Sequence, residues 1–176
     1  AKGSPVGLEN DLEQAFVAFL EEEPGDPVSQ ETAKIIKDGS VPIRLAPIPE
    51  AAIGAVYDQT EHAILINLDT LASRYANGPV GEENRELVVN GIRSSWERNP
   101  ESLRAFVADM APLLVHELRH ALFARRLGPH PSSVEEEMAC HAYEALFVRR
   151  RLRRNPDYLG FRQYDGLARQ YLGEPA

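Results

Sequence analysis

The segment from Glu101 to Leu127 constrains the fold most strongly, because it is apolar on almost every side of a helical projection. A helix that is hydrophobic all round is buried in the middle of its domain. Pro112 lies inside this segment and removes a helical hydrogen bond, so we expect a kink or a break there. Gly128-Pro129 ends it. Its apolar residues are Phe106, Val107, Met110, Leu113, Leu114, Val115, Leu118, Leu122 and Phe123.

Amphipathic segments surround this predicted central helix. The first has apolar residues spaced by three and four, from Leu8 to Leu20, and ends at Pro24-Gly25, which is typical of a helix. The same spacing predicts further helices over about 31–38, 68–75, 87–96, 133–154 and 156–172.

A short stretch with a different period lies between these helices. Val41, Ile43 and Leu45 alternate with other residues, and segments 54–58 and 63–67 flank a polar tetrad. This pattern predicts a strand followed by a β-hairpin, and the prolines at 42, 47 and 49 suit an edge or a strand end. No repeat or linker divides the chain. We therefore predict one α+β domain over 1–176, mainly helical with a small antiparallel sheet.

Composition and charge narrow the functional classes. The 176 residues, 43% hydrophobic and 26% charged, are typical of one globular domain. A net charge of −8 argues against general nucleic-acid binding, and no apolar run is long enough for a membrane span. The single cysteine, Cys140, excludes an internal disulfide. The chain starts Ala-Lys-Gly, which suggests a processed or truncated N-terminus; an exported and a cytoplasmic location both fit, and no oligomeric state is indicated.

The residues that carry chemistry lie on the predicted central helix, in the run Val115-His116-Glu117-Leu118-Arg119-His120. His116 and His120 are about one helical turn apart, so both imidazoles leave the same face and can meet one ion. Glu117 lies about 100° from His116 around the axis and can reach a water on that ion. Burying these three groups without a metal would leave each needing a polar partner. The pattern therefore predicts a catalytic Zn²⁺ site.

The third ligand is expected on the following helix. A helical wheel places Glu136 on the side that should pack inward, and Glu135 also falls in an apolar sector. A carboxylate on an inward face needs a partner, and a metal ion is one. Capping by the preceding serines also accounts for acidic residues in a first helical turn. We predict Glu136 as the ligand, with Glu135 and His141 as alternatives. The polar arc of the wheel holds Glu137, His141 and Glu144.

These motifs resemble a known class of zinc enzymes. His116 to His120 is the HExxH signature of the zincins, and Glu136-Glu-Met-Ala139 resembles the Glu-x-x-Ala element of several gluzincin-type families, whose Glu is the third zinc ligand. The hairpin ending at Asn67 resembles the strand pair that precedes HExxH in small minimal gluzincins. The resemblance covers roughly residues 41–150. The metzincin pattern is absent, since its Gly and third His fall on Phe123 and Arg126.

The resemblance implies a zincin-like fold and metal-assisted hydrolysis, most often of a peptide bond in a peptide or protein substrate. Glu117 would be the general base for a zinc-bound water. Tyr143 or His141 would donate to the developing oxyanion, and Asp109 would orient a ligand imidazole. The alternative is a zincin-like binding or regulatory module with a structural metal and no turnover.

Several other polar residues are expected to be ordinary. His62 and His130 fall in turns and are predicted to face solvent. The basic run 149–154 is predicted to be a solvated helix end that complements the helix dipole, with an anionic partner as the alternative. Cys140 is predicted to be a small buried residue near the metal, and the loop 24–40 is a candidate rim of the site.

Overall fold

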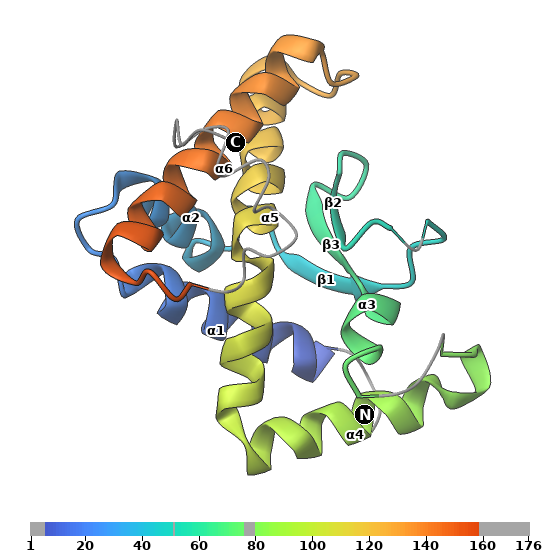
Figure 1. Ribbon diagram of the computed structural model, residues 1–176. Helices are drawn as coiled ribbons and strands as arrows, with labels where there is room; N and C mark the ends of the chain where they lie inside the picture. The colour runs from blue at the N-terminus through green and yellow to red at the C-terminus, as the bar shows by residue number, and fades with distance from the viewer. Residues whose placement is uncertain (1–5, 51, 76–79, 159–176) are drawn as a thin grey trace.

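The computed structural model describes residues 6–50, 52–75 and 80–158 (Figure 1). The predicted α+β class is confirmed, since helices dominate and the sheet has three short strands. The segment predicted as a last helix, 156–172, lies almost wholly outside the described residues. In chain order the elements are α1 (Val6–Glu21), α2 (Pro27–Lys37), β1 (Ile43–Ala46), β2 (Ala55–Asp58), β3 (Ala63–Asn67), α3 (Leu68–Ala72), the 3-10 helix η1 (Glu82–Asn84), α4 (Arg85–Arg98), α5 (Pro100–Leu127) and α6 (Val134–Arg154).

The sheet is mixed, so the predicted antiparallel sheet is wrong in one pairing. β2 and β3 form the expected hairpin, but β1 runs parallel to β3 in the order β1-β3-β2. The free edge of β1 is covered by α1: the backbone N–H of Ile43 donates to Glu13 Oε1 at 2.9 Å, and that of Leu45 to Glu9 Oε2 at 2.7 Å. Because these carboxylates satisfy the edge, β1 needs no further strand beside it.

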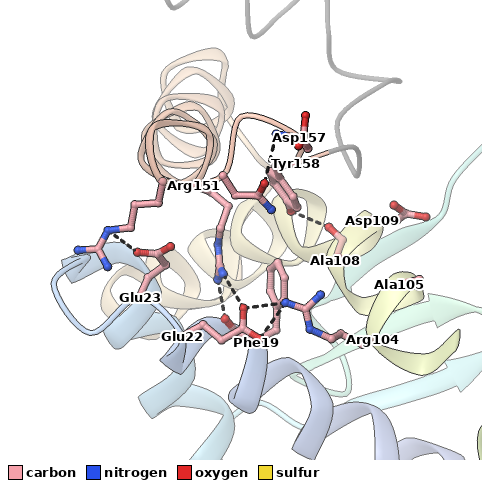
Figure 2. Close-up of a pocket in the computed structure, with 12 residues that line it drawn as sticks. Phe19, Glu22, Glu23, Arg104, Ala105, Ala108, Asp109, Arg151, Asp157 and Tyr158 are labelled. Carbon is pink, nitrogen blue, oxygen red and sulfur yellow. Dashed lines mark hydrogen bonds and ion pairs between the residues drawn. The ribbon is translucent and has the colours of Figure 1, made fainter. Parts of the chain in front are cut away.

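α5 is the centre of the fold, as its apolar surface predicts. It contacts α1, α2, α4, α6 and the strands β2 and β3 (Figure 1). Pro112 does not break it, so that part of the expectation is wrong, and α5 continues for 28 residues. Proline leaves the carbonyl of Ala108, one turn earlier, without its helical donor. The Tyr158 hydroxyl donates to this carbonyl at 2.6 Å (Figure 2), which replaces the missing bond.

The basic run at the end of α6 is solvated only in part, which corrects the prediction of a solvated helix end. Arg151 is buried, donates to Glu22 Oε2 at 3.1 Å and to the Phe19 carbonyl at 2.5 Å, and lies over the Phe19 ring (Figure 2). These residues line a pocket of about 370 Å³. Two further ion pairs join Arg150 to Asp26 and Arg154 to Glu23. These hydrogen bonds and ion pairs therefore hold the end of α6 against α1 and the start of α2.

None of the helices in the described ranges has the combined length and apolar character that crossing a membrane requires.

Candidate metal centre

The two histidines of α5 converge as their spacing predicts. Both side chains are buried, and their Nε2 atoms lie 3.2 Å apart. The rings meet edge to face, with centroids 5.0 Å apart. One helical turn of α5 therefore presents two imidazole nitrogens to a single point.

Glu137 of α6 faces the same point. Its Oε1 lies 3.2 Å from His120 Nε2 and its Oε2 3.4 Å from His116 Nε2. Zinc sites are tetrahedral with metal–nitrogen bonds of about 2.0–2.1 Å, which places neighbouring donor atoms about 3.3–3.4 Å apart. The three donor groups fit one face of such a tetrahedron. The side chain of Glu137 is 44% exposed, so this part of the site is in contact with solvent.

Glu136, the predicted third ligand, lies on the other side of His120. Its Oε1 accepts from His120 Nδ1 at 2.8 Å, and its Oε2 accepts from His130 Nε2 at 2.5 Å. Glu136 therefore orients the His120 ring through Nδ1. This is not the nitrogen that faces His116 and Glu137. The alternative Glu135 is exposed. Of the three acidic residues in the first turn of α6, Glu137 is the one whose carboxylate lies within 3.4 Å of both Nε2 atoms.

Glu144 plays the matching part for the other histidine. It is buried, and its Oε2 accepts from His116 Nδ1 at 3.1 Å and from His141 Nδ1 at 3.2 Å. The His141 ring lies beside His116, with centroids 4.5 Å apart, so the structure brings this predicted residue to the site. Each of these two imidazoles thus has its Nδ1 proton held by a carboxylate, which in the neutral ring leaves Nε2 as the free acceptor.

The buried hydrogen bonds make this point a good place for a cation. With both Nδ1 atoms donating, His116 Nε2, His120 Nε2 and the Glu137 oxygens are all acceptors. Acceptors 3.2–3.4 Å apart need a proton or a metal ion between them. A divalent ion satisfies all three groups together, so the donor set fits zinc.

Cys140 lies beneath the histidines, buried as predicted. One potential ligand atom from each of Cys140, His116 and His120 lies within 4.8 Å of the others. Burial raises the pKa of the Cys140 thiol to about 12, assisted by neighbouring carboxylates. Burial also opposes ionisation of Glu137, but a hydrogen bond from Ser132 and the nearby imidazoles outweigh it and lower the pKa of Glu137. The Glu137 carboxyl group is therefore ionised more easily than the Cys140 thiol.

Glu117 follows His116 on α5 and is held by the sheet. It is buried, and its Oε2 accepts from the backbone N–H of Tyr57 in β2 at 2.8 Å. Burial raises the pKa of Glu117, although that hydrogen bond and the two imidazoles act in the opposite direction. A carboxylate with a raised pKa is a better proton acceptor near neutral pH.

Two predicted residues have other partners. The Tyr143 ring packs under the guanidinium of Arg119, 3.4 Å from its centroid, and Arg119 in turn donates to Glu31 of α2. Asp109 forms an ion pair with Arg74. Within the described ranges, neither Tyr143 nor Asp109 forms a hydrogen bond or ion pair with His116 or His120. The Arg119–Glu31 contact joins α5 to α2, and residues 27–37 of the predicted rim 24–40 form α2.

Two histidines predicted to face solvent are half-buried. His130 binds Glu136, as given above, and His62 Nδ1 lies 2.5 Å from the Tyr57 hydroxyl. The sequence analysis also missed the part played by Glu137 and Glu144. The signal that finds these two is their spacing of seven residues, two helical turns, which places both on one face of α6.

Comparisons with known protein families, with curated proteins and with solved structures found no match.

Proposed function

We propose that this protein is a zinc-dependent hydrolase and, more specifically, a metallopeptidase. One observation carries the proposal: His116 Nε2, His120 Nε2 and the Glu137 carboxylate lie 3.2–3.4 Å from one another, the spacing of zinc ligands. Glu117, on the same turn of α5, supplies the carboxylate that a hydrolytic site needs and a structural site does not.

The side chains divide the work between them. His116, His120 and Glu137 would hold the ion, and Glu136 and Glu144 would keep both imidazoles in the correct tautomer. When bound, zinc would supply a water of lowered pKa and a Lewis acid for the scissile carbonyl. Glu117 would accept the proton of that water and deliver it to the leaving amine.

The oxyanion donor is better sought in His141 than in Tyr143. The His141 side chain is 42% exposed and lies beside His116. Its Nδ1 donates to Glu144, so it would need a second proton, on Nε2, to donate to a carbonyl oxygen bound at the site. The Tyr143 ring is covered by Arg119. A positioned donor of this kind stabilises the charge that develops on the carbonyl oxygen.

The test combines metal analysis with a matched pair of variants. Purified protein should contain about one zinc per chain and cleave a fluorescently labelled unfolded protein. Glu117→Gln should retain the zinc and lose the cleavage. Glu101→Gln, an exposed residue at the start of the same helix, should change neither.

Two results would count against this proposal. A Glu117→Gln protein as active as the wild type would exclude the assigned general base. Stoichiometric zinc without cleavage of any substrate offered would favour the alternative, a binding or regulatory module with a structural metal.

A further inference from the structure

We propose that His130, in the turn between α5 and α6, is a positioning residue that acts through Glu136 to orient His120 for metal binding. This inference rests on the proposed zinc site and adds to it a residue from outside the two ligand helices.

The His130 ring is held at both ends. Its Nδ1 donates to the carbonyl of Gly128 at 2.7 Å, and its Nε2 donates to Glu136 Oε2 at 2.5 Å. A carbonyl and a carboxylate only accept, so both ring nitrogens carry protons. The other oxygen of Glu136, Oε1, accepts from His120 Nδ1 at 2.8 Å. A chain of two hydrogen bonds therefore runs from the turn to the proposed ligand.

The backbone of His130 is fixed by the β2–β3 hairpin. Its N–H donates to Gln59 Oε1 at 3.0 Å, and its carbonyl accepts from Gln59 Nε2. An amide side chain offers both a donor and an acceptor, so it can pair with both backbone groups at once. The same hairpin supplies the Tyr57 N–H that holds Glu117. The β2–β3 hairpin thus holds in place both the turn that carries His130 and the side chain of Glu117, the proposed general base.

Glu136 has little freedom to hold His120 without this support. Its side chain is 92% buried, since its exposed fraction is 8%, and its second oxygen is bound by His130 alone among the contacts given for the described residues. Removing the His130 donor would leave a buried carboxylate oxygen without a partner, which favours rotation of the carboxylate. His120 Nδ1 would then lose its fixed acceptor and its orientation.

The experiment uses two variants that keep different halves of the ring. In His130→Gln the amide nitrogen stands near the position of Nε2 and can still donate to Glu136. In His130→Asn it stands near Nδ1 and reaches only the Gly128 carbonyl. Zinc affinity is measured by competition with a chromophoric chelator, and the geometry at the ion is read from the visible absorption of bound Co²⁺.

We expect a graded result. Partners that hold ligating histidines typically contribute about 10–100-fold in metal affinity, and His130 acts one hydrogen bond further away. His130→Asn should therefore weaken Zn²⁺ binding by about 3–10-fold and alter the Co²⁺ spectrum, whereas His130→Gln should stay within about twofold of the wild type with an unchanged spectrum.

Two results with the variants would overturn the inference about His130. Wild-type affinity and spectrum in His130→Asn would overturn the inference, and so would equal losses in both variants, since these would show a purely structural role. Both results leave the zinc site itself in place. A wild-type protein that binds no zinc would overturn the proposed function and this inference with it.

Discussion

Replacing the two neighbouring carboxylates Glu136 and Glu137 separately tests the construction of the site most directly. Glu137 faces the Nε2 atoms of both histidines, whereas Glu136 contacts the Nδ1 atom of one. On the proposed assignment, Glu137→Gln removes a ligand and Glu136→Gln only weakens the support of His120.

The two losses should differ in size. Structural zinc sites with four ligands bind with about 10–16 kcal/mol, or about 2.5–4 kcal/mol for each ligand. At about 1.4 kcal/mol for each factor of ten, Glu137→Gln should lower zinc affinity by roughly 10²- to 10³-fold. Glutamine at 136 keeps a carbonyl oxygen that accepts from His120 Nδ1, so Glu136→Gln should cost about 10-fold, the low end for such partners.

Chelator competition at fixed pH and ionic strength measures both affinities. Glu135→Gln, an exposed carboxylate in the same turn, is the control and should bind zinc as the wild type does. A larger loss in Glu136→Gln than in Glu137→Gln would refute this reasoning, because it would show that Glu136 is the ligand, as the helical wheel predicts.

Three further predictions concern stability. At zinc concentrations about 100 times the dissociation constant, chelator should remove about 2.7 kcal/mol and lower the melting temperature by about 5–11 °C; an unchanged melting curve would argue against a bound ion. Asp26→Ala removes a side chain that accepts from the backbone N–H groups of Val28 and Ser29 and should cost about 1–2 kcal/mol in urea unfolding, with Asp26→Asn closer to wild type. Tyr158→Phe should cost about 1 kcal/mol, and less in a Pro112→Ala background, where the helix regains its own donor; equal costs in both backgrounds would contradict the assigned replacement of the helical bond.

The parts of the fold that sequence predicts well are those set by local spacing. The apolar surface of α5 and the one-turn separation of His116 and His120 follow from helical geometry alone, so both are found without knowing any tertiary contact. The strand that pairs with β1 cannot be predicted from local spacing. Alternation identifies a strand but not its neighbour, and the neighbour here depends on Glu9 and Glu13 of α1, more than 25 residues away, which cover the outer edge of β1.

Glu137, and not the predicted Glu136, faces both Nε2 atoms for a related reason. A helical wheel treats α6 by itself and ranks residues by their distance from its apolar side. The site lies between α5 and α6, at the border of the buried face, so a residue from the polar arc reaches it. α5 and α6 are joined by a short turn, so residues before it on α5 face residues after it on α6: His120 contacts Glu136 and Glu137, and His116 contacts Glu137 and Glu144. Which residues reach the site therefore depends on how the turn places α6 against α5, and a helical wheel of one helix does not represent this.

The charges around the site also support the proposed ion. Glu117, Glu136 and Glu144 are buried beside His116 and His120, and isolated buried carboxylates are costly. Hydrogen bonds from Nδ1 and from Tyr57 relieve part of this cost, but they use the donors of the imidazoles and leave their Nε2 atoms facing a fourth carboxylate. A proton on one Nε2 satisfies the contact between the two rings, 3.2 Å apart, but it leaves the other Nε2 and the Glu137 carboxylate as acceptors 3.2–3.4 Å apart. A single divalent cation would satisfy all three groups together, and this supports the zinc site proposed for these residues.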